Sequence, residues 1–216
     1  MHVEEPQNTL AAALAEHQIE LSDEQTARLD AYCRVLWEWN EKINLTRHTD
    51  YQKFVTRDVV DSLAIAEQLG EGEKVLDVGS GGGVPGVILA VVRPDLNVTL
   101  SESIGKKARA LADMVERLKL PTRVIHGRAE DLLADERFDT LVIRAVARLS
   151  KLLTWFGPQR DGFERMLLVK GPSWVDERGE ARHHGQMNHL ALRKLAEYTI
   201  PGTEIQSVLL QITRKG

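Results

Sequence analysis

One stretch of the chain joins a short apolar run to a glycine-rich turn: Val75-Leu76-Asp77-Val78-Gly79-Ser80-Gly81-Gly82-Gly83-Val84-Pro85-Gly86. The apolar run predicts a buried strand. Five glycines within positions 79–86 predict a turn whose backbone a ligand can approach closely. Proline has a fixed φ that suits the first turn of a helix. The stretch therefore predicts a strand, a ligand-binding loop and a helix, in that order.

The same turn, read as Gly81-x-Gly83-x-x-Gly86, satisfies the dinucleotide fingerprint, which is a weak signal on its own. Two details favour S-adenosylmethionine over NAD. Asp77 lies inside the strand, where its carboxylate can accept a hydrogen bond from the methionine ammonium group directly or through water. Pro85 removes an amide donor that a pyrophosphate would use. The cofactor-binding candidates here are Asp77, Gly79, Ser80, Gly81, Gly83 and Pro85, and a tight turn without a ligand is the alternative.

After residue 72, short β-rich runs alternate with helical patterns. The predicted strands are 74–78, 97–100, 123–126, 140–143, 166–169 and 207–212, and the predicted helices are 87–92, 106–118, 149–156 and about 184–197. This alternation is typical of an α/β fold with a doubly wound, Rossmann-like sheet and right-handed crossovers. Ligands of such sheets bind at the carboxyl ends of the strands.

The first part of the chain has apolar residues at helical spacing and no glycine before Gly70. Ser22 followed by Gln25 has the form of a capping box. Glycines at positions 70 and 72 mark a boundary. The sequence thus predicts an N-terminal helical extension, residues 1–70, and a ligand-binding domain, residues 71–216.

Charge is distributed unevenly between these parts. The chain has a formal net charge of −4, residues 1–70 hold 6 Lys+Arg against 13 Asp+Glu, and residues 71–216 hold 22 against 19. Because nucleic acids favour basic surfaces, we expect a polyanion to bind the second part. We interpret the acidic first part as a solvated helical layer.

Several features bear on the compartment and on metals. The longest purely apolar runs, such as 87–92, are far shorter than the ~20 residues that span a bilayer. The single Cys33 fits a reducing compartment, and its place on an apolar helical face predicts an inert core thiol. His183, His184 and His189 lack a carboxylate at ligand spacing. We expect a cytoplasmic protein without a membrane or metal partner.

Polar residues follow the next two predicted strands. Glu102 ends the second strand, where an acidic side chain accepts hydrogen bonds from ribose hydroxyls. Lys106 opens the next helix, and a cation there indicates a nearby anion. Arg128, Ala129 and Glu130 follow the third strand, where a methyltransferase of this fold presents backbone and a carboxylate to adenine. A solvated loop and an acidic helix start are the respective alternatives for Glu102 and for 128–130.

Cations also follow the fourth and fifth strands. Arg144 and Arg148 flank the exit of the fourth, and Lys170 stands at the exit of the fifth. Two cations at neighbouring strand ends indicate an anionic or nucleobase ligand, and the arginine fork suits guanine O6 and N7 or a phosphate. Structural salt bridges are the alternative.

Taken together, these residues make the chain resemble the RsmG family, also called glucose-inhibited division protein B. The resemblance rests on a series of short motifs in the same order: Trp39-Asn40, Asn44-Leu45-Thr46, Asp61-Ser62-Leu63, the glycine stretch with its Gly-Val-Pro-Gly ending, Arg93-Pro94, Ser103 with Gly105-Lys106-Lys107, Arg128-Ala129-Glu130, Arg144-Ala145 and Lys170-Gly171. The family methylates N7 of one guanine in small-subunit ribosomal RNA with S-adenosylmethionine. The resemblance adds Ser103 to the cofactor-binding candidates.

This chain departs from the family pattern at two positions of interest. Glu102 replaces an aspartate and keeps the carboxylate. Asp58 stands where the family usually has histidine, which we expect to remove one contact at the interface of the extension.

The resemblance implies a simple mechanism. Guanine N7 carries an unprotonated lone pair, so attack on a sulfonium methyl needs alignment and no general base. As catalytic candidates, Arg144 would orient the guanine or the methionine carboxylate, and Lys170 would contact the substrate. The expected partner is 16S ribosomal RNA or the small ribosomal subunit, and we expect a monomer. Three alternatives remain: a methyltransferase of a small metabolite, an NAD-dependent dehydrogenase and a non-catalytic ribosome-associated module.

Overall fold

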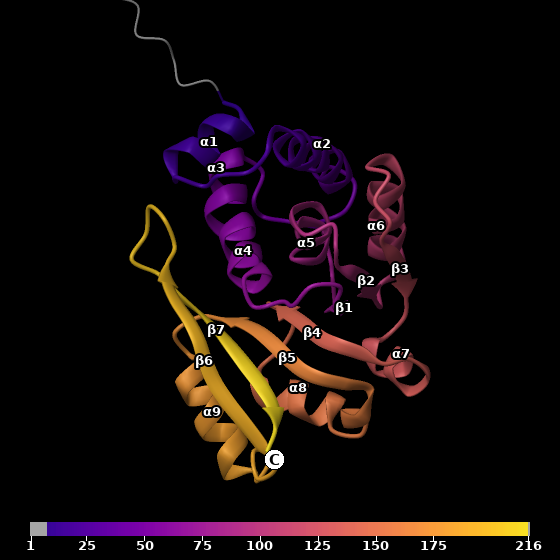
Figure 1. Cartoon of the computed structure of the whole chain (residues 1–216), viewed down its shortest axis with the longest axis vertical. Helices are drawn as coiled ribbons and strands as arrows, with labels where there is room; N and C mark the ends of the chain where they lie inside the picture. Colours follow the sequence, from indigo (N-terminus) through magenta and orange to yellow (C-terminus); the bar gives the residue numbers. More distant parts are fainter. Residues whose placement is uncertain (1–7, 216) are drawn as a thin grey trace, which may run out of the picture.

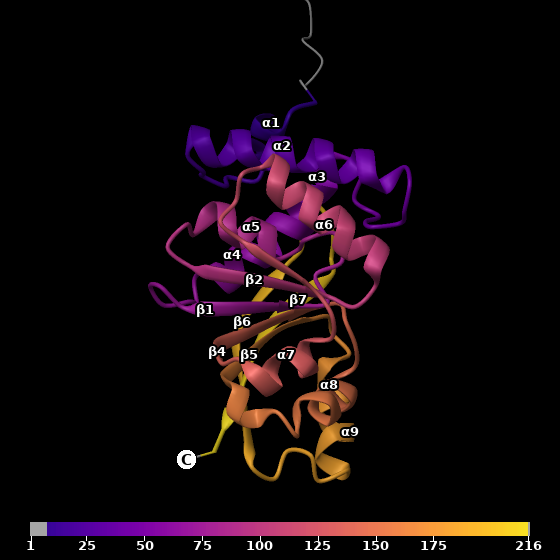
Figure 2. The same cartoon turned by 90° about the vertical axis from the view of Figure 1, so that its right-hand side faces the viewer.

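The computed structural model describes residues 8–215 (Figures 1 and 2). Its centre is one seven-stranded sheet in the order β3-β2-β1-β4-β5-β7-β6. The strands are β1 Lys74–Val78, β2 Asn97–Glu102, β3 Arg123–His126, β4 Phe138–Arg144, β5 Phe163–Lys170, β6 Leu190–Thr199 and β7 Gln206–Arg214. Strands β1 to β5 are parallel, whereas β7 pairs antiparallel with both β5 and β6. The predicted doubly wound sheet is confirmed.

Helices cover both faces of the sheet (Figures 1 and 2). On one face lie α7 Ala129–Asp135, α8 Leu149–Phe156, η2 Arg160–Gly162 and α9 Trp174–His183. The other face carries α5 Gly86–Val92 and α6 Gly105–Arg117, together with the N-terminal elements α1 Leu10–Glu16, α2 Asp23–Asn40, α3 Tyr51–Lys53, the π-helix η1 Phe54–Val59 and α4 Val60–Ala66. The two connections from β1 to β3 thus run over one face and the two from β3 to β5 over the other. Because β1 to β5 are parallel, their carboxyl ends all lie at one edge of the sheet.

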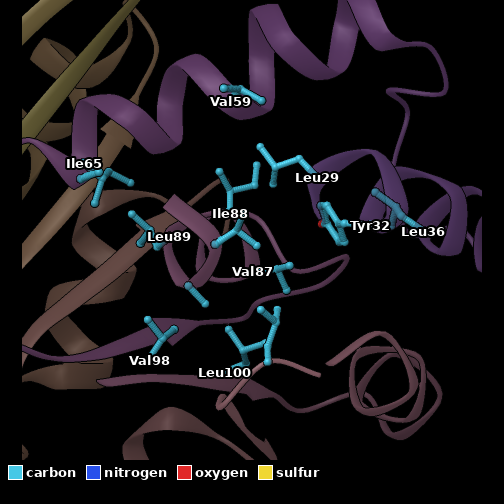
Figure 3. Close-up of a cluster of buried hydrophobic side chains, with 14 of the residues drawn as sticks. Leu29, Tyr32, Leu36, Val59, Ile65, Val87, Ile88, Leu89, Val98 and Leu100 are labelled. Carbon is cyan, nitrogen blue, oxygen red and sulfur yellow. The ribbon is translucent and has the colours of Figure 1, made fainter. Parts of the chain in front are cut away.

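Helix α5 lies between the N-terminal helices and the sheet (Figure 3). Val87, Ile88 and Leu89 are fully buried. Leu29 of α2 approaches from above and Leu100 of β2 lies below, in one hydrophobic cluster. A helix that is apolar all round must be buried on every side, and this explains the continuous apolar run in the sequence.

The N-terminal segment is helical, as predicted. The capping box is present, since the Ser22 hydroxyl accepts from the Gln25 amide and the Gln25 side chain accepts from the Ser22 amide. Helix α2 ends at Asn40, whose side-chain oxygen accepts from the amides of Leu45 and Thr46 at 2.8 and 2.9 Å. The segment and the sheet share one hydrophobic cluster. A division into two domains at residue 70 stays a prediction.

Helix α2 contacts both the core and the sheet-bearing part of the chain, and Cys33 is buried as its place on the apolar face predicted. Cys33 is fully buried, and burial raises the pKa of its thiol. Trp39 packs toward the sheet-bearing part, where its indole Nε1 donates to Asp113 of α6 at 2.7 Å. The neighbouring Trp37 donates instead to the His48 carbonyl within the N-terminal segment.

The predicted helix over about 184–197 is wrong. Helix α9 ends at His183, Gly185 adopts a left-handed φ of +71°, and residues 190–199 form β6. Leu, Ala, Lys and Glu in this segment favour a helix by intrinsic propensity. The long antiparallel pairing with β7 overrides that propensity, since strand formation depends on tertiary neighbours.

Candidate active site

The glycine loop joins β1 to α5, in the predicted order of strand, loop and helix. Gly79, Gly81 and Gly83 have φ values of +66°, +57° and +105°, which side chains rarely tolerate. A Cβ at Gly83 would lie 2.6 Å from Val87 Cγ2. Glycine is thus required here by both backbone conformation and space.

Asp77 lies beneath this loop. Its side chain is 1% exposed, and Oδ2 accepts from the Gly86 amide at 3.0 Å. Burial raises the pKa of this carboxyl to about 7, against the lowering effect of that hydrogen bond. The carboxylate does not line either of the cavities described below, so its observed contact is with the start of α5.

Glu102 holds the loop from the neighbouring strand. Its Oε2 accepts from the Gly81 amide at 3.0 Å and its Oε1 accepts from the Ile104 amide at 2.7 Å. The end of β2 and the glycine loop are therefore joined through one buried carboxylate.

The N-terminal helices close the outer side of the loop. The Tyr32 hydroxyl donates to the Gly82 carbonyl at 2.7 Å. A Cβ on Gly82 would lie 3.1 Å from Leu36 Cδ1 and 3.5 Å from the Leu45 carbonyl oxygen. The loop is thus packed between β1 and side chains of the first 70 residues.

Two cavities open at the carboxyl edge and share Gly79 and Val146. The smaller, of about 150 Å³, is lined among others by four predicted residues: Ser103, Arg128, Ala129 and Glu130. The larger, of about 820 Å³, is lined among others by Gly79, Ser80, Gly81, Arg144 and Lys170. The structure brings these candidates together around the glycine loop.

Other candidates lie near this edge without lining either cavity. They are Asp77, Gly83, Pro85, Glu102 and Lys106. Pro85 immediately precedes α5, as its sequence position indicated. Lys106 lines neither cavity, whereas its neighbour Lys107 lines the larger one.

Arg144 is held by two buried aspartates from the N-terminal segment. Its Nε donates to Asp61 Oδ2 at 2.7 Å, and its Nη2 lies 2.8 Å from Asp58 Oδ1. Burial alone would lower the pKa of the guanidinium, but the two carboxylates raise it. Arg144 therefore stays charged and fixed in direction.

The two aspartates have further partners. Asp58 is 2.9 Å from His48 Nδ1, and Asp61 Oδ1 accepts from the Tyr198 hydroxyl of β6 at 2.7 Å. Burial and the adjacent Asp61 raise the pKa of Tyr198. The expectation that Asp58 costs the extension a contact is wrong, because Asp58 itself pairs with Arg144 and His48.

The other two cations of this edge also form ion pairs. Lys170 Nζ donates to the Ala147 carbonyl at 2.6 Å and to Glu177 at 2.8 Å, and Arg148 pairs with Glu180 at 2.6 Å. The salt-bridge alternative therefore describes their contacts. Lys170 and Arg148 nevertheless both line the larger cavity.

The sequence reasoning did not identify the partners of these cations. Asp58 and Asp61 are more than 80 positions from Arg144. Glu180 is 32 positions from Arg148, whereas Glu177 is only 7 positions from Lys170. One signal was available, since Asp61 interrupts the apolar run Val59-Val60-Asp61-Ser62-Leu63. A carboxylate within such a run is rarely buried without a partner.

The site fits the predicted cofactor. Left-handed glycines expose loop backbone, a carboxylate ends β2, and the adjoining 150 Å³ cavity carries the residues expected around adenine. Within residues 8–215, no group of three metal-ligating side chains is found. No helix among the described residues is long and apolar enough to cross a membrane.

Two solved structures are similar to this fold. MtNAS in complex with MTA and tNA matches with a TM-score of 0.58 and 13% identity, covering 89% of this chain and 75% of that chain. TrmK of M. capricolum in complex with S-adenosylhomocysteine matches with a TM-score of 0.53 and 13% identity, covering 72% of this chain and 68% of that chain. These similarities show that the chain shares the fold of both structures.

Sequence relatives are much closer. Ribosomal RNA small subunit methyltransferase G of Rhodopirellula baltica is 51% identical over 188 residues, 87% of this chain and 81% of that protein. The protein of the same name from Marinobacter nauticus is 36% identical over 95% of this chain and 94% of its own length. The family model described as "rRNA small subunit methyltransferase G" matches residues 25–204. The chain therefore belongs to the rRNA small subunit methyltransferase G family.

Proposed function

We propose that this protein transfers the methyl group of S-adenosylmethionine to N7 of a guanine in 16S ribosomal RNA. One observation carries the proposal. In a chain of this family, a left-handed glycine loop separates a small cavity with the residues expected around adenine from a larger cavity lined by cations.

The residues around the loop divide naturally between the parts of the cofactor. Ser103, Arg128, Ala129 and Glu130 would surround the adenine. Glu102, at the end of β2, would act on the ribose side of the cofactor by holding the Gly81 amide of the loop. The amides of the glycine loop would meet the methionine part. Asp77 would act beneath them by holding the start of α5. Bound there, S-adenosylmethionine supplies a methyl group activated by a sulfonium.

Arg144 is suited to orient the acceptor. Its Nε and Nη2 are taken by Asp61 and Asp58, while its Nη1 forms no hydrogen bond with the residues that the structure describes. This atom is available to donate to guanine O6 or to the methionine carboxylate. The two aspartates fix its direction, and a fixed donor is what an alignment mechanism requires.

Lys170 lines the larger cavity together with Arg144. Its ammonium is held by Glu177 and the Ala147 carbonyl, and the side chain is 12% exposed. The loop after β4 is thereby fixed to β5 beside Arg144. We propose that a remaining N–H of Lys170 contacts the substrate from this position.

Mass spectrometry of 16S ribosomal RNA from cells with and without the gene tests the proposal. Loss of one 7-methylguanosine, restored by the wild-type gene, is expected. An unchanged nucleoside profile would overturn it and would favour the small-metabolite methyltransferase. Calorimetry separates the remaining enzyme class, because a dehydrogenase would bind NADH and not S-adenosylhomocysteine.

The cellular setting belongs to the same proposal. We infer a monomer that works in the cytoplasm on 16S ribosomal RNA or on the small subunit. Methyl transfer from tritiated donor to protein-free RNA and to subunits lacking the modification distinguishes the two substrates. Light scattering of the enzyme in solution tests the monomer.

A further inference from the structure

The larger cavity has a strong excess of positive charge. Six Lys and Arg side chains line it against three Asp and Glu, whereas the whole chain has a formal net charge of −4. Three of the six, Arg144, Arg148 and Lys170, are engaged with carboxylates. The other three are Arg47, Arg57 and Lys107, and none of them forms a salt bridge within the described part of the chain.

The cations of the N-terminal segment follow the same division between paired and unpaired side chains. Residues 1–70 contain 6 Lys and Arg. Four of them pair with nearby carboxylates, as Arg28–Glu24, Arg34–Asp30, Lys42–Glu38 and Lys53–Asp50. The remaining two, Arg47 and Arg57, are without such a partner among residues 8–215, and both line the larger cavity.

These three cations reach the cavity from separate elements. Arg47 lies in the loop after α2, Arg57 lies in η1, and Lys107 lies in the first turn of α6. Like charges that converge on one concave surface repel one another and focus a positive potential there. An anionic ligand would relieve that repulsion.

The cofactor is a poor candidate for this anion. Its sulfonium and ammonium groups outweigh its single carboxylate, so S-adenosylmethionine cannot neutralise three cations. The anion must then accompany the acceptor. A nucleic acid strand presents regularly spaced phosphates on either side of the base that it offers.

We propose that Arg47, Arg57 and Lys107 bind backbone phosphates of the RNA strand next to the acceptor guanine. The acidic helical segment thereby supplies two of the three phosphate contacts. This departs from the expectation that a polyanion would meet residues 71–216, because the net charge of a segment does not report where its uncompensated cations lie. The inference rests on the proposed RNA substrate.

The test compares two triple variants of the full chain. The cavity variant carries Arg47→Gln, Arg57→Gln and Lys107→Gln. The control carries Lys74→Gln, Lys119→Gln and Arg160→Gln, which removes the same charge. The control residues lie at or near the opposite edge of the sheet, form no salt bridge with described carboxylates and do not line the larger cavity.

Binding to unmodified 16S ribosomal RNA and to small subunits lacking the modification is measured across a series of salt concentrations. Loss of three phosphate contacts lowers the slope of log K against log salt by about 2, at ~0.7 per contact for single-stranded RNA. We expect this decrease in the cavity variant alone, with S-adenosylhomocysteine binding unchanged in calorimetry. The single variant Arg47→Gln should lower the slope by about one third as much.

The outcomes separate the two proposals. Equal salt slopes for the cavity variant and the control, with a wild type that methylates the RNA, would overturn the phosphate assignment and leave the proposed function standing. A wild type that binds S-adenosylhomocysteine but neither binds nor methylates either RNA substrate would overturn both.

Discussion

Alanine at Gly86 should destabilise the protein, whereas alanine at Gly179 should stabilise it. Both glycines lie in helices, at the start of α5 and within α9, and neither has a left-handed φ. The chemical change is one methyl group in each case. The opposite signs of the stability change therefore depend on the surroundings of each glycine alone.

The size of each stability change follows from the distances between the added Cβ and its neighbours. A Cβ at Gly86 would lie 2.2 Å from Leu100 Cδ2 and 2.6 Å from Asp77 Oδ2, and both neighbours are buried. Overpacking of a core costs about 1–3 kcal/mol. Displacing the buried Asp77 from its hydrogen bond adds about 1–3 kcal/mol. At Gly179 nothing lies within 4 Å, so the variant gains up to about 1 kcal/mol of helix propensity.

Urea denaturation followed by circular dichroism measures both variants. We expect Gly86→Ala to lower the free energy of unfolding by about 2–6 kcal/mol with an unchanged m-value. Calorimetry with S-adenosylhomocysteine should show weaker binding for this variant only, because Asp77 and the loop move together. The reasoning would be refuted if Gly86→Ala stayed within about 0.5 kcal/mol of wild type, or if Gly179→Ala lost as much stability as Gly86→Ala.

Three further predictions follow from the buried polar groups. Asp61→Asn should lower the free energy of unfolding by about 3 kcal/mol in urea titrations and should reduce kcat, because Arg144 loses a buried charged partner and Tyr198 loses its acceptor. A variant that matches wild type in both stability and kcat would contradict the proposed role of Asp61 in holding Arg144. The Asp77 pKa is raised from 3.8 to about 7, so its contribution to stability is full below about pH 4 and declines as the pH rises to about 7. The free energy of unfolding of wild type minus that of Asp77→Asn, measured by urea titration at several pH values, should therefore fall over that window and level off above it; a constant difference would argue against the raised pKa. The buried Cys33 thiol should react with iodoacetamide far more slowly in the native protein than in urea, and equal rates would show that it is accessible.

Local signals account for what the sequence predicted well. The glycine loop, the buried strand before it and the capping box at Ser22 each depend on residues within a few positions of one another. Helix α5 was also predictable, because its apolar run is continuous. Residues that follow parallel strands were correctly expected to gather at one edge, although their individual contacts were not.

Interactions between distant segments account for what the sequence could not supply. Asp58 and Arg144 are 86 positions apart, and nothing local to either one indicates the other. Strand β6 has residues that favour a helix, and only its pairing with β7 makes it a strand. Lys106 and Lys107 are adjacent and chemically alike, so their different directions depend on how α6 sits against the sheet.

The hydrogen bond from Tyr32 to the Gly82 carbonyl has a consequence for how such a protein can be altered. A chain shortened to begin after residue 70 would leave the outer side of the glycine loop uncovered. It would also expose Ile88 and Leu89, which are fully buried in the intact protein. Grafting the N-terminal helices of another relative would have to bring a matching loop with them. The N-terminal helices and the glycine loop pack against each other, so a substitution in one is expected to require a compensating substitution in the other.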